Sequence, residues 1–144
     1  MTYSQAFSQG VEILIFIHMK SVKEFYKYLS IPKIAEGLNM PVPSVKRLVE
    51  MLKKADLIVS KTGVAGGLAL AQPVDKISLL DILQAIEGKK SLFNIYQEFN
   101  LDEFPDKDEV IVLLKNSQQL FQNIEDTAFN SLQSTSLLDL FAGT

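Results

Sequence analysis

The sequence predicts a mostly α-helical fold with one small β-hairpin. Apolar residues recur at helical spacing in five segments, a pattern typical of helices that bury one face. Two short β-prone stretches, 57–60 and 68–71, flank a glycine-rich turn and indicate a hairpin. The 144 residues, 47% of them hydrophobic, suffice for the core of one domain.

The first two helices are expected over residues 4–20 and 31–38. The first is apolar most of the way round, which predicts a buried helix. Its apolar face contains Phe7, Val11, Ile13, Leu14, Ile15, Phe16, Ile17 and His18. Ser30 can cap the second helix, and Pro32 is tolerated in the first turn because its missing N–H would have no partner there.

A third helix is expected to open at Pro43 and to run to about Ala55. Pro41 and Pro43 prevent the second helix from continuing into it. One stripe is apolar at positions i, i+3, i+4 and i+7, so this face packs and the other is available. The packed stripe is Val45, Leu48, Val49 and Leu52, and the other face holds Lys46, Arg47, Glu50, Lys53 and Lys54.

Two further helices are expected after the hairpin. Ser78 starts a helix over residues 79–87, which Gly88 closes. Asp106 and Glu109 have the spacing of a capping box, and a long helix runs from there to about Leu132. Its seam positions alternate steps of four and three, which suits packing against another helix. They are Val110, Leu114, Ser117, Phe121, Ile124 and Ala128, widened by Leu113 and Leu120.

Composition excludes several kinds of site. The chain has no cysteine, which rules out disulfides, thiolate-held iron–sulfur clusters and thiol nucleophiles. His18 is its single histidine, so zinc lacks its usual ligands. The acids between residues 102 and 109 do not have the spacing of a calcium loop. With no nucleophile–base pair visible, we expect no enzyme, no cofactor and no metal site.

The sequence also predicts where the protein works. No segment approaches the roughly 18 uncharged apolar residues that a membrane span requires. The N-terminus has no basic region before its apolar residues and no small-residue cleavage site after them, so no secretory signal is indicated. We therefore expect a cytoplasmic protein with no membrane partner.

The charge is distributed unevenly along the chain. The net charge of −3 at first argues against a nucleic-acid partner. However, residues 1–61 hold nine Lys or Arg against five acids, whereas residues 62–144 hold five against twelve. Such asymmetry is expected when one face meets a polyanion, and it also arises by chance.

Residues 31–48 meet several separate constraints of a helix-turn-helix. Ile34 and Leu38 supply the inward face of the first helix, and Ala35 leaves room where the second helix crosses closely. Asn39 lies at the turn, where the backbone needs a positive φ. The outward N-terminal part of the second helix would enter a major groove, where Arg47 can pair with a guanine edge. This part of the helix carries Pro43, Ser44, Lys46 and Arg47. The alternative is that these residues form an ordinary solvated face without a DNA contact.

The glycine-rich turn at residues 63–67 predicts a hairpin tip, or wing. A phosphate-cradling nucleotide loop leads from a strand into a helix, whereas this turn leads into the β-prone residues 68–71. At a wing, Ser60, Lys61 and Thr62 can reach a phosphate or an adjacent minor groove. The alternative is a bare structural turn.

Three stretches carry a family resemblance: Ile34-Ala35-Glu36, the Gly66-Gly67 pair followed by Leu68-Ala69-Leu70-Ala71, and the helix after Ile77-Ser78-Leu79. With the order of elements over residues 4–135, they resemble the Rrf-two family of bacterial transcription regulators. The resemblance implies a winged helix-turn-helix dimer, usually a repressor, whose long C-terminal helix crosses between subunits.

The chain departs from that family in two places. Members that sense iron–sulfur clusters carry three cysteines in the region corresponding to residues 92–108, and this chain has none. It therefore looks like the cysteine-free members, which respond to other ligands, partner proteins or unidentified signals. The family's wing often has Arg before its first glycine, where this chain has Thr62.

We expect a DNA-binding domain at residues 1–88, a linker or effector region at 89–107, and a dimerisation helix with a tail at 108–144. The homodimer would bind duplex DNA at an inverted repeat; a winged-helix protein-interaction module without DNA binding is the rival. The expected dimer interface consists of Val110, Leu113, Leu114, Ser117, Phe121 and Ile124. The linker carries four aromatic residues, Phe93, Tyr96, Phe99 and Phe104. They either line a pocket for an unknown effector, a small molecule or a protein, or simply pack.

Overall fold

The computed structural model describes residues 4–144. Contacts divide the chain into two compact units, the first running up to Lys89 and including Leu132–Thr144, the second Lys90–Ser131. The helices are α1 (Ala6–Glu24), α2 (Ile31–Leu38), α3 (Val42–Lys54), α4 (Leu79–Glu87) and α5 (Lys107–Ser134). The strands are β1 (Ile58–Lys61) and β2 (Gly67–Leu70), and short 3₁₀ helices occupy Val74–Lys76, Leu101–Glu103 and Leu137–Phe141.

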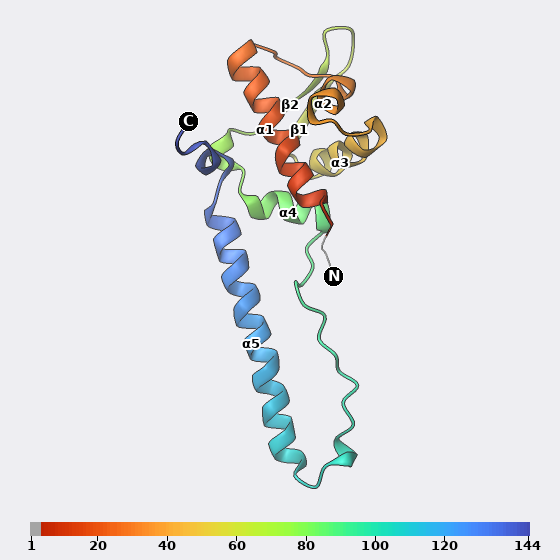
Figure 1. Cartoon of the computed structure of the whole chain (residues 1–144), viewed down its shortest axis with the longest axis vertical. Coiled ribbons are helices and arrows are strands. Elements are labelled where there is room, and N and C mark those ends of the chain that lie inside the picture. Colours follow the sequence, from red (N-terminus) through yellow and green to blue (C-terminus); the bar gives the residue numbers. More distant parts are fainter. Residues whose placement is uncertain (1–3) are drawn as a thin grey trace. The chain divides into compact units, whose positions relative to one another are not determined.

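The predicted mostly helical fold with one small hairpin is confirmed (Figure 1). Both α2 and α4 have the predicted bounds. The first helix continues to Glu24, where Phe25 ends it with a left-handed φ of 61°. The third begins at Val42, because a proline is tolerated throughout the first helical turn and Pro43 need not come first. Within residues 4–144, no helix has the length and hydrophobicity needed to cross a membrane.

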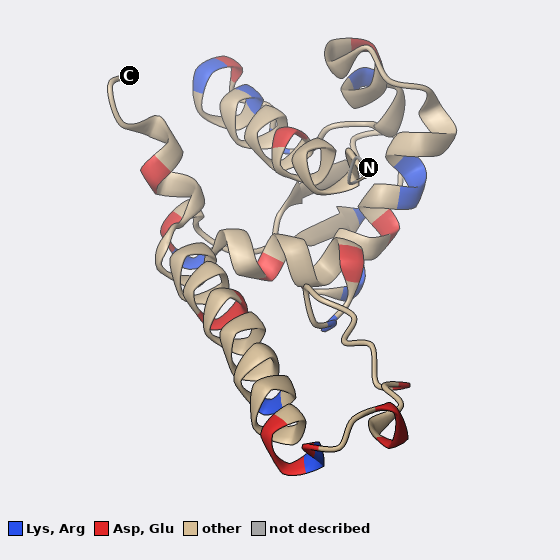
Figure 2. Ribbon diagram, turned by 60° about the horizontal axis from the view of Figure 1, so that its bottom comes forward, with Lys and Arg blue, Asp and Glu red and all other residues tan. Residues whose placement is uncertain are grey.

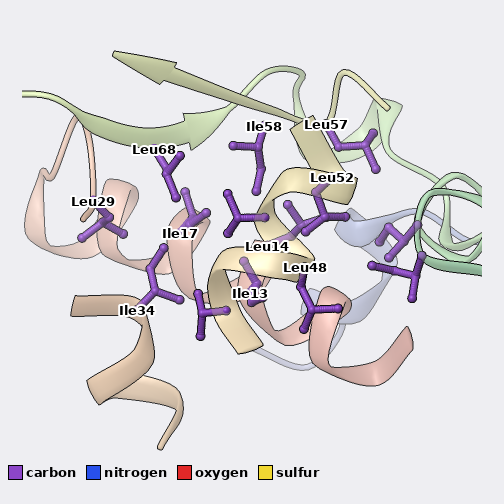
Figure 3. Close-up of a cluster of buried hydrophobic side chains, with 14 of the residues drawn as sticks. Ile13, Leu14, Ile17, Leu29, Ile34, Leu48, Leu52, Leu57, Ile58 and Leu68 are labelled. Carbon is purple, nitrogen blue, oxygen red and sulfur yellow. The ribbon is translucent and has the colours of Figure 1, made fainter. Parts of the chain in front are cut away.

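The core of the first unit forms around α1. Figure 3 shows Ile13, Leu14 and Ile17 of this helix facing side chains of α3 and of the hairpin, and all three are at most 3% exposed. Each buried Leu or Ile contributes about 1.5–3 kcal/mol through removal of apolar surface from water. The side chains that meet them from other elements include Leu29, Ile34, Leu48, Leu52, Leu57, Ile58 and Leu68.

The hairpin gains a third strand-like segment from the chain between α1 and α2. β1 and β2 pair antiparallel, with Ser60 opposite Leu68 and Lys61 opposite Gly67. On the other edge of β2, Leu29 and Leu68 exchange two backbone hydrogen bonds of 2.9 and 2.7 Å. A Cβ on Gly67 would lie 2.6 Å from the Leu29 carbonyl oxygen, so only glycine permits this approach.

The C-terminal residues belong to the core of the first unit. Leu137 is fully buried, and its N–H donates to the Ile77 carbonyl at 2.9 Å. The Leu79 N–H donates to the Thr135 carbonyl at 2.8 Å. These bonds fasten the last residues to the start of α4, where Ser78 and Asp81 form a capping box. The hydrophobic core is thus closed by a segment distant in sequence from the rest.

The second unit contains most of α5 and the extended chain before it. Residues 91–95 lie along this helix, since the Phe93 and Phe121 rings are 5.4 Å apart and the Leu92 N–H donates to the Glu125 carboxylate. The chain then turns through the 3₁₀ helix at Leu101–Glu103. Asn100 caps that turn by accepting from the Asp102 N–H at 3.0 Å.

Candidate nucleic-acid interface

The outward face of α3 holds the residues that were predicted to enter a major groove. Pro43, Lys46 and Arg47 are exposed, and Ser44 is half-buried. Figure 2 shows basic positions along this helix. The opposite stripe, made of Val45, Leu48, Val49 and Leu52, is at most 1% exposed, so packing fixes which face of α3 is presented. A shallow depression runs over the exposed face, lined by Pro43, Lys46, Arg47, Glu50, Met51 and Lys54.

The turn before α3 has the geometry that its sequence predicts. Asn39 adopts a left-handed φ of 54°, and its N–H donates to the Glu36 carbonyl at 3.2 Å. The Met40 N–H donates to the Ala35 carbonyl at 2.9 Å, which completes the end of α2. At the other end of α2, the Ser30 hydroxyl accepts from the Lys33 N–H at 3.3 Å. The two helices are therefore joined in one fixed orientation.

The three predicted wing residues lie together at the end of the hairpin. Ser60, Lys61 and Thr62 are all exposed, with Lys61 the last residue of β1 and Thr62 the first of the tip. Gly63 follows with a φ of 102°, which an L side chain adopts only under strain. Among these three residues, Lys61 carries the positive charge that can attract a phosphate.

The structure adds two side chains to the wing that the sequence interpretation did not include. The Lys61 ammonium lies 5.4 Å from the centre of the Tyr28 ring, and the Lys27 ammonium lies 6.0 Å from the same ring. Because thirty-three residues separate Tyr28 from Lys61, helical or strand periodicity gives no indication that they meet. The one available signal was the alternation of Tyr and Lys at residues 26–28, which places bases among aromatic rings.

A second lysine–tyrosine contact occurs at the start of α2. The Lys33 ammonium lies 4.3 Å from the centre of the Tyr26 ring and donates a 2.8 Å hydrogen bond to its hydroxyl oxygen. This hydrogen bond raises the pKa of Lys33 above its ordinary value of 10.5, helped by the nearby charges of Glu24 and Glu36. The contact therefore favours the charged form of Lys33.

The predicted dimer-interface residues on α5 divide into two groups. Val110 and Leu114 are half-buried, and the Phe121 ring packs against Phe93 of the same chain. A second stripe faces outward and is strongly exposed; it consists of Leu113, Ser117, Leu120 and Ile124. The predicted seam thus has one edge engaged within the chain and one edge uncovered.

The four aromatic residues of the linker do not surround a common cavity. Phe99 stacks on Phe104 with 5.5 Å between ring centres, Phe93 packs on Phe121, and Tyr96 is 77% exposed. The cleft between residues 91–95 and α5 measures about 60 Å³. Small-molecule sites typically measure about 300–1,000 Å³, so this cleft is too small to be one.

Comparisons with known proteins identify relatives over nearly the whole chain. Residues 3–143 match the Rrf2 family model, described as iron-dependent transcriptional regulator. YwnA of Bacillus subtilis, designated an HTH-type transcriptional regulator, is 30% identical over 129 residues, covering 89% of this chain and 92% of its own. The regulator CymR of the same organism is 31% identical over 115 residues, covering 80% and 73%.

The relation extends to solved structures. The structure of CymR, described as the global cysteine regulator of B. subtilis, aligns with a TM-score of 0.73 at 26% identity. The alignment covers 100% of this chain and 98% of CymR. The structure of IscR from T. potens aligns with a TM-score of 0.69 at 21% identity, covering 97% and 85%, which supports the same winged-helix fold.

The iron dependence in the family description does not fit the residues of this chain. It has no cysteine thiolate to hold an iron–sulfur cluster. Its one histidine, His18, is half-buried and packs edge-on against the Phe141 ring at 5.2 Å. No group of three or more potential metal ligands occurs within the described residues 4–144. The relatives are regulators and not enzymes, and the chain belongs to the Rrf2 (Rrf-two) family of DNA-binding transcription regulators.

Proposed function

We propose that this regulator acts in the cytoplasm as a homodimeric repressor that binds an inverted-repeat operator. The observation that carries the proposal is the exposed face of α3, held outward by a fully buried stripe within a helix-turn-helix. A helix held in this way presents its N-terminal residues to a major groove. Arg47 would pair with a guanine edge, while Ser44 and Lys46 bind bases less specifically or hold phosphate, and Pro43 contacts the groove wall.

The wing supplies the second contact of each subunit. Ser60, Lys61 and Thr62 are exposed at the end of the hairpin, where they can reach a flanking phosphate or minor groove. Thr62 has no charge, so most of the electrostatic attraction at this point comes from Lys61. We assign the DNA-binding domain to residues 1–88.

The uncovered stripe on α5 supports the formation of a dimer with a second copy of the chain. Leu113, Leu120 and Ile124 are 59%, 63% and 54% exposed, and a contiguous exposed apolar patch of this kind is typical of a surface that binds another protein. A two-fold dimer formed through residues 108–144 places two α3 helices in successive major grooves, about 34 Å apart. An effector, small molecule or protein, would act on residues 89–107 and change that spacing.

The proposal is tested by selecting tight-binding sequences from a random duplex library. Enrichment of an inverted repeat with half-sites one helical turn apart, and an affinity that falls steeply with salt, are expected. The double variant K46A/R47A should then lose at least about tenfold in affinity, because each direct base contact is worth roughly 1–3 kcal/mol. The control K89A/K90A removes the same charge from two adjacent exposed lysines outside α3 and should retain most of the affinity.

One other function is favoured by a specific observation. The net charge of −3 suits a winged-helix module that binds protein rather than DNA. That module would enrich no duplex sequence and would be indifferent to K46A/R47A. Enrichment that K46A/R47A leaves intact would instead overturn only the assignment of the α3 face.

A further inference from the structure

We propose that the outer face of the wing sheet, formed by Lys27, Tyr28 and Lys61, is a phosphate-binding surface that extends the contact with duplex DNA beyond α3 and the wing tip. This inference rests on the proposed DNA-binding function and adds residues between α1 and α2 to it. Lys27 and Tyr28 belong to no element that the helix-turn-helix motif uses to read a groove.

The backbone pairing determines which side chains share this face. Successive residues of a strand point to opposite faces of a sheet. Leu29, Ile58 and Leu68 are buried, so their face is the inner one, and Tyr28 and Lys61 belong to the outer face. Lys27 lies in the bend before Leu29, where the alternation does not apply, and it joins the surface through its contact with the Tyr28 ring. The residues that β2 contributes to the outer face are Gly67 and Ala69.

The small residues of β2 explain how side chains from its two neighbours meet. Gly67 has no side chain and Ala69 has only a methyl group, so nothing long rises between β1 and the Tyr28 segment. The Lys61 ammonium crosses this low strand and lies 5.4 Å from the Tyr28 ring centre. The Lys27 ammonium lies 6.0 Å from the same ring. One ring therefore positions two ammonium groups through cation–π attraction.

The two charges are available to an external anion. Within residues 4–144, the ion pairs are Lys20–Glu24 and Lys107–Asp102, and neither Lys27 nor Lys61 takes part in one. Both lysines are exposed. Two like charges held near one aromatic ring repel each other, and a phosphate between or beside them relieves that repulsion. Contacts of lysines with backbone phosphates carry no sequence information, so such a surface adds affinity that does not depend on sequence.

The location also favours DNA as the source of the phosphate. Lys61 ends β1 and adjoins the wing tip, so a backbone that contacts the tip continues onto this face. Each lysine that neutralises a phosphate releases counterions and adds about 0.9 to the slope of log affinity against log salt. The slope is thus a readout that a loss of folding stability would not reproduce.

The experiment measures the affinity of the full-length protein for its selected duplex and for a scrambled duplex at four salt concentrations. K27Q should weaken both complexes by at least about fivefold to tenfold at 0.1 M salt. Because the dimer carries two copies of Lys27, the slope should fall by about two. K76Q removes another exposed lysine of the same unit and should leave the slope unchanged. Y28F keeps the ring and should match wild type, whereas Y28L should lower the slope while the circular dichroism spectrum stays native.

The outcomes separate this inference from the function on which it rests. If wild type binds no duplex, both fail. If wild type binds and K27Q behaves like K76Q, the outer face of the sheet is not a phosphate-binding surface, although the proposed function stands. If Y28L proves unstable, K27Q still decides the matter, since it replaces an exposed side chain that the wing tip does not include.

Discussion

The carboxylate of Glu125 accepts a hydrogen bond from the backbone N–H of Leu92, thirty-three residues earlier in the chain. Its second oxygen accepts from the Gln122 side chain at 3.2 Å. Within residues 4–144, Glu125 is the one charged side chain that is buried, at 8% exposure. A buried carboxylate is costly unless it is hydrogen-bonded, so this arrangement fastens residues 91–95 to α5.

Replacement of Glu125 by Ala should therefore release the linker. A hydrogen bond to a charged group contributes about 1.5–3 kcal/mol, so the Leu92 amide should exchange its hydrogen at least about tenfold faster. Hydrogen exchange followed by NMR measures this rate directly. Glu98→Ala removes an exposed acid of the same linker and should leave it unchanged. Equal exchange rates at Leu92 in wild type and E125A would show that the bond does not hold the linker.

The packing of the C-terminal segment predicts a large stability difference between two adjacent leucines. Leu137 is fully buried, whereas Leu138 is 51% exposed. Leu137→Ala should lower the free energy of unfolding by about 2–5 kcal/mol through the lost contacts and the cavity. Leu138→Ala should change it by no more than about 0.5 kcal/mol. Chemical denaturation of both variants measures the difference, and similar values for the two would contradict the burial of Leu137.

Sequence reasoning succeeded where local chemistry determines the structure. Ser30 and Asn39 mark the two ends of α2, because a hydroxyl N-cap and a left-handed turn residue act on their immediate neighbours. Helical spacing alone predicts the buried stripe of α3. The position of this stripe determines which residues of α3 face the solvent. The glycines also located the hairpin turn, but the predicted strands, 57–60 and 68–71, are each shifted by one residue from Ile58–Lys61 and Gly67–Leu70, and Gly67 begins β2 instead of ending the turn.

It failed where the contacts join distant segments. Nothing around Leu137 indicates that it closes a core formed mainly by residues before Lys89, and nothing around Leu29 indicates that it pairs with β2. The meeting of Tyr28 and Lys61 depends on that pairing and was missed for the same reason. Long-range pairing is set by the whole topology, which a periodicity window of one helix or strand does not contain.

Substitutions of two wing glycines distinguish the cost of backbone strain from the cost of a steric clash. Gly63 has a φ of 102° and open space where a Cβ would lie, whereas Gly67 has a φ of 143° and the Leu29 carbonyl oxygen 2.6 Å from that position. Gly63→Ala should cost about 1–2 kcal/mol of stability from φ alone. Gly67→Ala should cost about 3 kcal/mol or more, because Leu29 must also move away from β2. Thermal unfolding measures both, and a G67A cost no greater than that of G63A would argue against the Leu29–β2 pairing.

The Lys33–Tyr26 contact predicts a measurable change in titration. The hydrogen bond from Lys33 to the Tyr26 hydroxyl raises the pKa of this lysine above 10.5, so Tyr26→Phe should lower it toward that value. Since the folded pKa is the higher one, the contact stabilises the fold below pH 10.5 and this stabilisation is lost as the pH rises through the raised pKa. NMR titration of the lysine side chains measures the shift. As a control, Tyr96→Phe removes an exposed hydroxyl elsewhere and should leave the pKa of Lys33 unchanged. If Lys33 had the same pKa in Y26F as in wild type, the contact with Tyr26 would be contradicted.

The uncovered stripe of α5 makes the most direct prediction about assembly. Leu120 lies on the stripe with Leu113 and Ile124, at seven-residue and four-residue spacings that keep them on one side of the helix. Leu120→Asp should raise the dimer dissociation constant by about 30-fold or more, since a charge buried at the centre of an interface costs at least about 2 kcal/mol. Sedimentation equilibrium measures that constant. Val112 is 54% exposed on a different side of α5, so V112D should stay dimeric, with helical content unchanged in both variants. A dimer that withstands L120D, or one that V112D weakens equally, would move the interface away from this stripe.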